Sequence, residues 1–462
     1  MKRRDAIRIL PLSIAGMAGH ALSEKMPVKQ NSGYHEPLSM RYVTKVIDML
    51  TWIRENQSEN LLEASYAIAD TVQNGGQCWQ SGWDAGHTQA DLWPGRNGEP
   101  EIFKTWNGPE DSKDGDLLIT GSSRGTEEFI KHLTEKDIVL VSHPSPWSGD
   151  AKFPELVRDD IRKLSLKDHA NIWIETNNST LGGIMYLPGM PAPIGPVSAV
   201  IGKVTIWMMI ADACRILARR GISLPVRGDE PELSEKVDWK SFSGWVSLYD
   251  PLMDNYFKEV ITQLKMIRTE LGNIRKIGKM AADSVIEGGT LYGYSRYTSI
   301  AGEANTRRAG LALTRGIYGR DGGTFKGSSK DCVIMGITKP DDEIDLHFFD
   351  EFKKSNMRIA SIGPMTRNII VPEGRAVHKE TEVHVGRMCD TYGLFAVPGF
   401  AQKICPTSGV VINQLFWACI MEFAEQFIER TGNVPAVYYS GALKGGMEHY
   451  IRMQNISNEQ GY

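Results

Sequence analysis

The pattern of apolar and polar residues repeats itself once along the chain. Residues 59–82 and residues 272–295 each have apolar positions at helical spacing, then a glycine pair, then a short apolar run. A glycine pair is typical of a helix end, because glycine adopts the left-handed conformation of a C-cap without strain. Gly288 follows Gly75 by 213 positions. A repeat of that period indicates a duplicated domain, in which each copy starts with a helix that leads into a strand.

Short apolar runs and long apolar helices then recur in the same order in both copies. The runs have the length of buried strands, and they lie at residues 77–82, 116–120, 137–142 and 170–175 and again at 290–294, 331–337, 357–362 and 382–388. Each copy closes with a long apolar helix, at 197–220 and at 409–430. Lys203 and Asp212 interrupt the first of these, so we interpret it as a buried core helix and not as a membrane span. Strands alternating with helices predict the α/β class, with a parallel sheet covered on both faces in each copy.

The spacing between matching residues changes within the first copy. Lys136-Asp137 matches Lys330-Asp331 at an offset of 194, which is smaller than 213. The change predicts an insertion in the first copy, and residues 95–115, which are rich in Gly, Pro and Asp, are its expected place. Such a loop is either a lid over a site or a surface loop without a function.

The chain begins with the pattern of an export signal. Arg3-Arg4 precede an apolar, small-residue run at residues 7–22. We expect a twin-arginine signal peptide at 1–22, and therefore an exported, periplasmic protein without a membrane segment after cleavage. The other predicted boundaries are a linker at 23–40, a first domain at 41–228, a second linker at 229–248 and a second domain at 249–462.

Composition and charge narrow the classes of partner. With 41% apolar and 23% charged residues the chain is typical of a globular protein. A net charge of -4 gives it no broad basic surface for nucleic acid. The six cysteines include no C-x-x-C pair and no histidine at metal spacing, so we expect no metal and no cofactor. The assembly state stays open, a homo-oligomer included.

Three segments carry a resemblance to a known family. His87 follows the first strand, Glu303 and Arg308 follow its counterpart in the second copy, and the chain's last stretch reads S-G-A-L-K-G-G-M-E-H from Ser440 to His449. These segments resemble the G-T-G-H-S-H loop, the A-E-E…R-A-G-G helix and the S-A-N…G-G-D-E-H ending of SIS (sugar isomerase) domains, in particular small bacterial members similar to phosphoheptose isomerases. The resemblance implies a three-layer α/β/α sandwich in each copy and a pseudo-dimer of the two copies.

Two loops depart from the family's pattern. Members that bind phosphosugars carry a loop of the S-x-S-G-x-T type after the second strand, where hydroxyl and backbone N–H groups hold the phosphate near a helix N-terminus. At that place we expect the proline-containing residues 142–150 in the first copy and the acidic residues 337–345 in the second. Prolines lack N–H donors and carboxylates repel phosphate, so we expect an unphosphorylated substrate.

The resemblance and the residue chemistry together suggest a set of site residues. Carboxylates, and histidines near neutral pKa, suit acid–base catalysis, and the candidates are Glu303, His449, Glu448 and His87. Arginines can clamp oxyanions, and tryptophan rings stack on sugar C–H faces. The substrate-binding candidates are Arg296, Arg308, Ser295, Trp83, Asp84, Asp91, Ser440 and Lys444. His143, after a strand end, is a further candidate contact, and His384, inside a strand, is a core histidine.

The leading hypothesis is an exported, sugar isomerase-like enzyme acting on an unphosphorylated sugar or a sugar-derived carbonyl compound. One group would remove the proton next to the carbonyl and another would protonate the oxygen, which gives isomerisation, epimerisation or elimination through an enediol-type intermediate. The alternative is a non-catalytic sugar-binding protein of the same fold. The identity of the sugar, the choice between isomerase, lyase and binder, and the number of working sites stay open at this point.

Overall fold

The computed structural model of the chain describes residues 36–81, 97–144, 157–162, 164–178, 182–187, 193–228, 246–297, 299–305, 307–319, 324–339, 341–364, 374–387, 393–441 and 443–460. The expected signal peptide and most of both expected linkers lie outside these ranges. So does the loop that holds four candidate site residues, Trp83, Asp84, His87 and Asp91.

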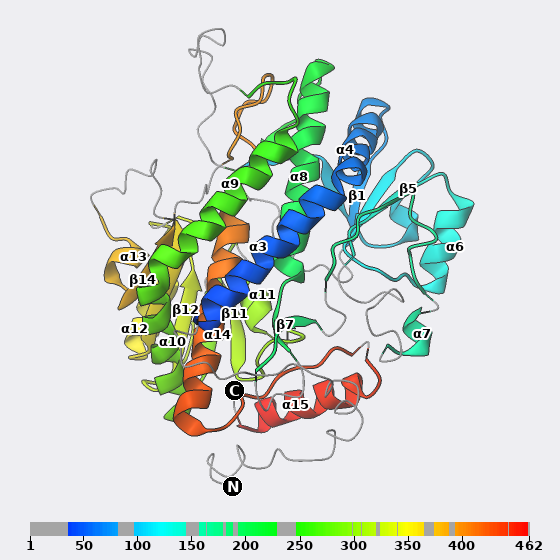
Figure 1. The fold of residues 1–462 in the computed structure, drawn as a ribbon. Helices are drawn as coiled ribbons and strands as arrows, with labels where there is room; N and C mark the ends of the chain where they lie inside the picture. The colour runs from blue at the N-terminus through cyan, green and yellow to red at the C-terminus, as the bar shows by residue number, and fades with distance from the viewer. Residues whose placement is uncertain are drawn as a thin grey trace.

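Two parallel sheets, one from each half of the chain, lie on opposite sides of the long helices in the middle of the molecule (Figure 1). The first has the order β3-β1-β4-β5-β6, with strands Phe103–Trp106, Cys78–Ser81, Leu117–Thr120, Val139–Ser142 and Ile172–Trp173. The second has the order β11-β10-β12-β13-β14, with strands Thr314–Tyr318, Leu291–Ser295, Cys332–Gly336, Arg358–Pro364 and Val383–Arg387. All the expected strands are present and the two orders correspond strand by strand, which confirms the predicted α/β class.

Helices cover both faces of each sheet. On the faces toward the middle, α4 (Ser58–Gln73) packs on α8 (Ser198–Arg219), and α10 (Leu271–Ile286) packs on α14 (Ser408–Thr431). On the outer faces, Phe129 of α6 (Glu127–Glu135) joins a cluster with Leu118, and Phe352 of α12 (Glu343–Lys354) joins one with Val333. Each half is therefore the three-layer α/β/α sandwich that the SIS resemblance implies.

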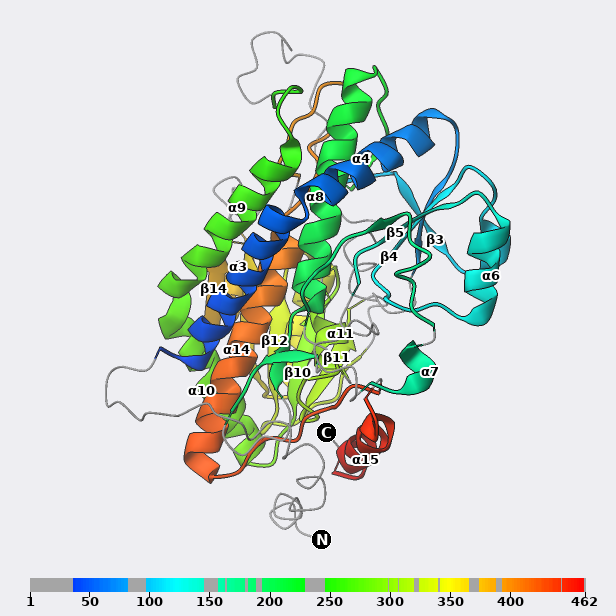
Figure 2. The same cartoon turned by 45° about the vertical axis from the view of Figure 1, so that its right-hand side comes forward.

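The first helices of the two halves are exchanged. Helix α3 (Leu38–Asn56) packs on α14 of the second half, and α9 (Leu252–Met266) packs on α8 of the first (Figure 2). Arg54 of α3 forms an ion pair with Asp254 of α9. The exchange is reciprocal, as in a dimer with swapped elements, so the predicted pseudo-dimer is confirmed.

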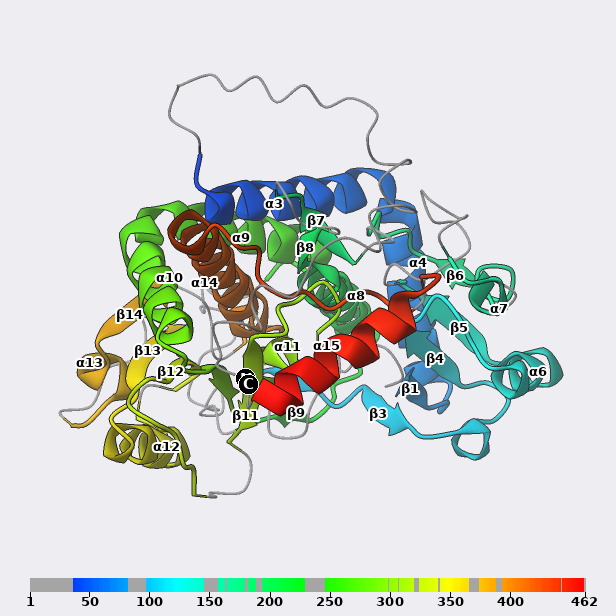
Figure 3. The same ribbon diagram turned by 90° about the horizontal axis from the view of Figure 1, so that it is seen from below.

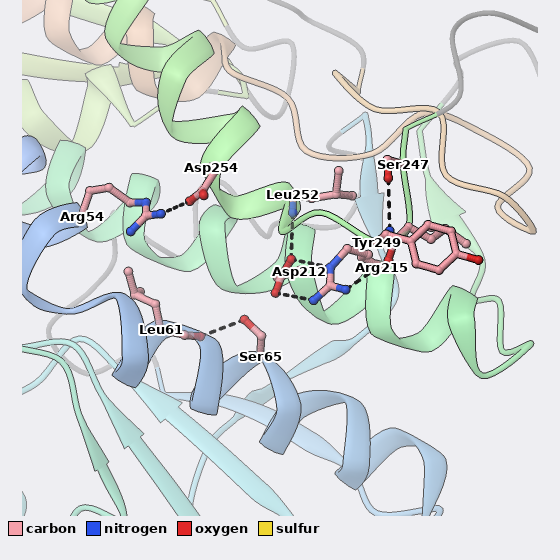
Figure 4. A network of polar contacts seen from close by, with 10 residues as sticks. Arg54, Leu61, Ser65, Asp212, Arg215, Ser247, Tyr249, Leu252 and Asp254 are labelled. Carbon is pink, nitrogen blue, oxygen red and sulfur yellow. Dashed lines mark hydrogen bonds and ion pairs between the residues drawn. The ribbon is translucent and has the colours of Figure 1, made fainter.

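A buried ion pair holds the join between the halves (Figure 4). Within α8, the guanidinium of Arg215 donates to the carboxylate of Asp212 at 2.8 and 3.0 Å. Asp212 also accepts the backbone N–H of Leu252, the first residue of α9, at 2.8 Å. Asp212, one of the two charged residues that interrupt the apolar pattern of 197–220, thus connects α8 to the start of the second half. Among the described residues no helix has both the length and the apolar character needed to cross a bilayer.

The remaining short elements connect the layers. The strand β2 (Glu99–Pro100) pairs with β9 (Val226–Arg227), and β7 (Gly183–Met185) pairs with β8 (Ile194–Pro196). The other short helices are η1 (Pro109–Asp111), α7 (Asp159–Arg162), η3 (Ile267–Glu270), α11 (Ile300–Ala304) and α13 (Val377–Glu380). The last helix, α15 (Gly446–Gln460), lies across the bottom of the molecule (Figure 3), where Leu443 before it forms a β-bridge with Val157 of the first half.

The expected insertion in the first copy is wrong. Asp116 accepts the backbone N–H of Gln77 at 2.9 Å, and Asp331 accepts that of Thr290 at 2.8 Å, each bond joining the start of one core strand to its neighbour. The counterpart of Asp331 is therefore Asp116, at an offset of 215, and not Asp137.

The segment 95–115 is part of the sheet instead of a lid or a surface loop without a function. It contains β3, the edge strand of the first sheet, whose counterpart in the second is β11. The two central residues of β3 are exposed, and this is why its apolar pattern is too weak to predict a strand.

Candidate functional site

In parallel α/β sheets, ligands bind at the carboxyl ends of the strands. In the second half this end carries Glu303, on the short helix α11 that follows β10. Its side chain is buried, with 1% exposed. One carboxylate oxygen accepts the indole N–H of Trp417 at 2.8 Å and lies 3.3 Å from Nε of Arg307. These contacts fix the position of an ionisable carboxyl group beside the strand end.

Both halves hold the helix that carries Glu303. Ser299, immediately before α11, accepts Nζ of Lys203 at 2.8 Å and Nδ2 of Asn413 at 3.0 Å on its hydroxyl oxygen. Lys203 and Asn413 are each the sixth residue of their long helices, α8 and α14. The backbone carbonyl of Ser299 in turn accepts the N–H of Glu303 at 2.8 Å. Two equivalent positions, one in each long helix, therefore contribute to the site at Glu303. They hold different residues, Lys203 and Asn413.

Arg296, a candidate clamp for substrate, is engaged within the protein. Its Nη1 lies 2.7 and 2.5 Å from the two carboxylate oxygens of Asp342. Asp342 caps α12 and accepts the backbone N–H groups of Ile344 and Asp345, both at 3.1 Å. A carboxylate thus occupies the helix N-terminus at which an anionic ligand would otherwise bind. The neighbouring candidate Ser295 is also buried, and its hydroxyl accepts the N–H of Ala301 at 3.0 Å.

A second carboxyl group lies just inside that helix. Asp345 is buried and accepts the phenol O–H of Tyr294 at 2.7 Å. Burial, with the nearby charge of Asp342 as a smaller cause, raises the pKa of Asp345 to about 7. Burial and the charge of Asp345 also raise the pKa of Tyr294. Asp345 therefore exchanges a proton near neutral pH.

The first half has a different chemistry at the same place. The loop after β4, residues 121–126, is the structural counterpart of the loop after β12, and it reads G-S-S-R-G-T. Thr126 caps α6 there and accepts the N–H of Phe129 at 3.1 Å, in the position that Asp342 has in the second half. The expectation that residues 142–150 form this loop is wrong, because Ser142 ends β5, one strand further on. Only the second half therefore has a carboxylate cap on the helix that follows its central strand.

His143 follows β5 and lies against α8. It is buried, and a Cβ added to Gly202 would lie 3.7 Å from its ring. Neither ring nitrogen has a hydrogen-bond partner among the described residues. Burial lowers the pKa of His143 to about 4, so the ring is neutral at pH 7. Its counterpart in the second sheet is Ile362.

The C-terminal candidates form a separate group. His449 is buried and stacks on Tyr439 at 3.7 Å between ring centroids. Its Nε2 lies 2.9 Å from the carbonyl of Val437, and its Nδ1 lies 3.1 Å from Arg452. Burial lowers the pKa of His449. The Nε2 contact holds α15 against the segment before it, whereas the Nδ1 contact with Arg452 lies within α15 itself.

The other candidates of the ending differ in exposure. Ser440 is buried, whereas Lys444 and Glu448 are exposed. Arg308 is half-buried on the loop after α11. The catalytic and binding roles of all these residues stay predictions. Within the described ranges, no group of three or more His, Cys, Asp or Glu side chains is placed to hold a metal ion.

Sequence reasoning missed the residues that surround Glu303. Asn413 and Trp417 lie more than 100 positions from Glu303, on a helix that the sequence marks only as apolar, and Ser299 is a small polar residue on the loop before Glu303. Lys203 was the one available signal, because a lysine inside an apolar helix must find polar partners when it is buried.

Comparisons with known proteins give distant likenesses. No model of a known protein family matches the chain. A "UPF0309 protein" of Streptomyces griseus is 24% identical over 223 residues, which cover 41% of this chain and 87% of that protein. One from Streptomyces coelicolor is 23% identical over 223 residues, covering 42% and 88%.

The likenesses to solved structures are also distant. The C-terminal domain of glucosamine-fructose-6-phosphate aminotransferase from Francisella tularensis has a TM-score of 0.46 at 10% identity, covering 87% of this chain and 99% of that one. Tagatose-6-phosphate ketose/aldose isomerase from Escherichia coli has a TM-score of 0.39 at 11% identity, covering 87% and 97%. At this level the likenesses identify no activity. The chain's own sheets show a tandem α/β/α protein, and its architecture fits two SIS-like domains.

Proposed function

We propose that the protein is a sugar isomerase-like enzyme whose working site lies in the second half, around Glu303. The carboxylate of Glu303 would take the proton from the carbon next to the substrate carbonyl and return it to the neighbouring carbon. The observation that carries the proposal is the fixed, buried carboxyl group at the carboxyl end of β10, held by Trp417 and Arg307. Positioning of this kind is what proton transfer at carbon requires.

The substrate we propose for this site is an unphosphorylated sugar or a sugar-derived carbonyl compound. Asp342 supports this, because its carboxylate already takes the N–H groups at the start of α12 and the charge of Arg296. A phosphate at the same place would meet like charge. The names of the similar solved structures refer to sugar phosphates, and those names describe those proteins.

A second candidate is a sugar phosphate bound in the first half. The loop 121–126 favours it, since it has hydroxyl side chains at the N-terminus of a helix that carries no carboxylate cap. A third reading, a non-catalytic sugar-binding protein, is favoured by the two engaged nitrogens of His449, which leave that predicted acid–base group structural.

One experiment separates these readings. The protein is incubated in D₂O with D-glucose, D-fructose and their 6-phosphates, and both exchange of substrate C–H protons and product formation are followed by NMR. Calorimetry measures binding of the same compounds. Exchange with an unphosphorylated sugar, lost in Glu303→Gln, supports the proposal. Binding without exchange favours the binder, and tighter binding of a phosphate ester that survives Asp342→Thr favours the first-half site.

We also propose that the protein is exported to the periplasm. The support is the twin arginine at Arg3-Arg4 before an apolar run. Replacing both arginines by lysine should keep the protein in the cytoplasm, which cell fractionation measures. Normal export of that double variant contradicts the assignment.

A further inference from the structure

Two amide side chains on the second turn of α14 have hydrogen-bonding atoms without partners. Asn413 and Gln414 are both fully buried. Among the described residues, Oδ1 of Asn413 and both Oε1 and Nε2 of Gln414 meet no hydrogen-bonding group. Buried polar atoms are nearly always satisfied in folded proteins, by protein, water or ligand. Three such atoms on adjacent residues therefore require an explanation.

Asn413 belongs to the group of contacts that holds Glu303, and Gln414 is the next residue on α14. Nδ2 of Asn413 donates to Ser299 at 3.0 Å, and Trp417, three residues after Gln414, donates to Glu303 at 2.8 Å. Residues three apart on a helix are neighbours on its surface. Gln414 thus lies one turn from the indole that binds the proposed catalytic carboxylate.

The fold itself does not require a polar residue at this position. Gln414 is the seventh residue of α14, and the seventh residue of α8 is Val204, which is buried in the hydrophobic core. The two long helices are equivalent elements. At this position α8 packs the aliphatic side chain of Val204 in the core, whereas α14 buries the amide of Gln414. A polar group that costs stability without serving the fold is typical of a functional site.

We propose that the amides of Gln414 and Asn413 bind hydroxyl groups of an uncharged sugar-like ligand next to Glu303. A primary amide presents one donor group and one acceptor atom, which matches a hydroxyl that also donates and accepts. The amides carry no charge, so they provide no counter-ion for an anionic group of the ligand. The inference rests on the proposed function and names the residues that would recognise its substrate.

The test compares Gln414→Met with a matched control, Gln80→Met. Gln80 is another buried glutamine, and its Nε2 has no partner among the described residues, but it lies on β1 of the first sheet. Calorimetry measures binding of D-glucose, D-fructose and D-sorbitol, and thermal unfolding is recorded without ligand. We expect Gln414→Met to weaken binding by about tenfold or more, because it loses hydrogen bonds to the ligand. Its Tm without ligand should stay level or rise, since an unsatisfied polar group is removed. Gln80→Met should bind the sugars like the wild type.

Each other result overturns the inference. If wild type binds a sugar and Gln414→Met binds it equally well, the amide is not a ligand contact, although the proposed function stands. Equal losses of affinity in the Gln414 and Gln80 variants show a general effect of core substitution. If the wild type binds none of the three compounds, the proposed function fails together with the inference. Should Gln414→Met not fold, Gln414→Leu is judged by the same criteria.

Discussion

The two halves of the molecule share a strand order but differ at the ends of equivalent strands. The helix after the central strand is capped by Thr126 in the first half and by Asp342 in the second. In the next strand, His143 directly follows β5 in the first half, and its counterpart Ile362 lies inside the longer strand β13 in the second. Strand interiors keep the same apolar character because they must pack between helices. The strand ends are free of that demand, so chemistry can diverge there without loss of the fold.

The difference extends to the place where the halves meet. Lys203 and Asn413 hold the same position in equivalent helices, yet both donate to the one hydroxyl of Ser299. A symmetric arrangement would need a second serine for the second donor. The first half therefore contributes a lysine to its partner's site.

The largest expected effect concerns Glu303. If the chemistry belongs to the second half, Glu303→Gln should lower the rate of substrate C–H exchange by about 10²–10⁴-fold, the usual contribution of an acid–base group. Glutamine keeps an acceptor for Trp417 but leaves the charge of Arg307 unbalanced, so some stability is lost as well. NMR exchange rates and thermal unfolding measure the two effects. Retained exchange in this variant would assign the chemistry to the first half.

The next effect is a loss of stability with rising pH that arises in the second half. The folded-state pKa of Asp345, about 7, lies above that of an unfolded aspartate, so the folded protein holds a proton that the unfolded chain has released. Stability should fall as pH rises from about 4 to about 7, by on the order of a few kcal/mol. Asp345→Asn should reduce this decline in denaturant unfolding, and part of it should remain because burial also raises the pKa values of Glu422 and Glu425. An unchanged slope in the variant excludes Asp345 as its source.

The first half should respond to pH in the opposite direction. His143 stays neutral in the folded protein down to a pKa of about 4, whereas an unfolded histidine gains its proton near 6.5. Stability is therefore lost as pH falls from about 6.5 toward 4. His143→Ile, which introduces the residue of the second half, should reduce this loss. Burial also lowers the pKa values of His378, His384 and His449 in the second half, so part of the loss remains. A variant as acid-sensitive as wild type contradicts the assignment.

A smaller effect is expected for the C-terminal segment from Ser440 to His449, which the first half lacks. His449→Ala removes a buried hydrogen bond to the carbonyl of Val437 and should destabilise the protein by about 1–3 kcal/mol. Denaturant unfolding measures this change. The exchange rate per folded molecule should stay near that of wild type. A loss as large as that of Glu303→Gln, without a loss of stability, would restore His449 as a catalytic group.

The smallest effect tests the two helix caps by exchanging them. Asp342→Thr keeps a cap on α12 but releases Arg296, at a cost of about 1 kcal/mol or less for a partly exposed ion pair. Phosphate should then stabilise the variant more than it stabilises wild type, relative to chloride at equal ionic strength. Thr126→Asp should have the converse effect in the first half. Equal responses to phosphate in all three proteins would mean that the caps do not control anion binding.

The sequence by itself determined the duplicated helix-to-strand units, the eight core strands and the two long buried helices. Helical spacing, glycine pairs and short apolar runs are local patterns, and burial between two layers enforces them. It also singled out Glu303 and Arg296 on the loop after a core strand. The side chains that contact Glu303 and Arg296 could not be predicted from the sequence.

Only the tertiary structure decided which segments correspond and which residues meet. The edge strand β3 has exposed central residues and is defined by its pairing with β1, so its local pattern is weak. The exchange of α3 and α9 depends on packing between helices far apart in the sequence. Lys203 reaches Ser299 across 96 positions, and Trp417 reaches Glu303 across 114. Such contacts are set by how the two halves pack, because no periodicity within a segment specifies a partner in another half.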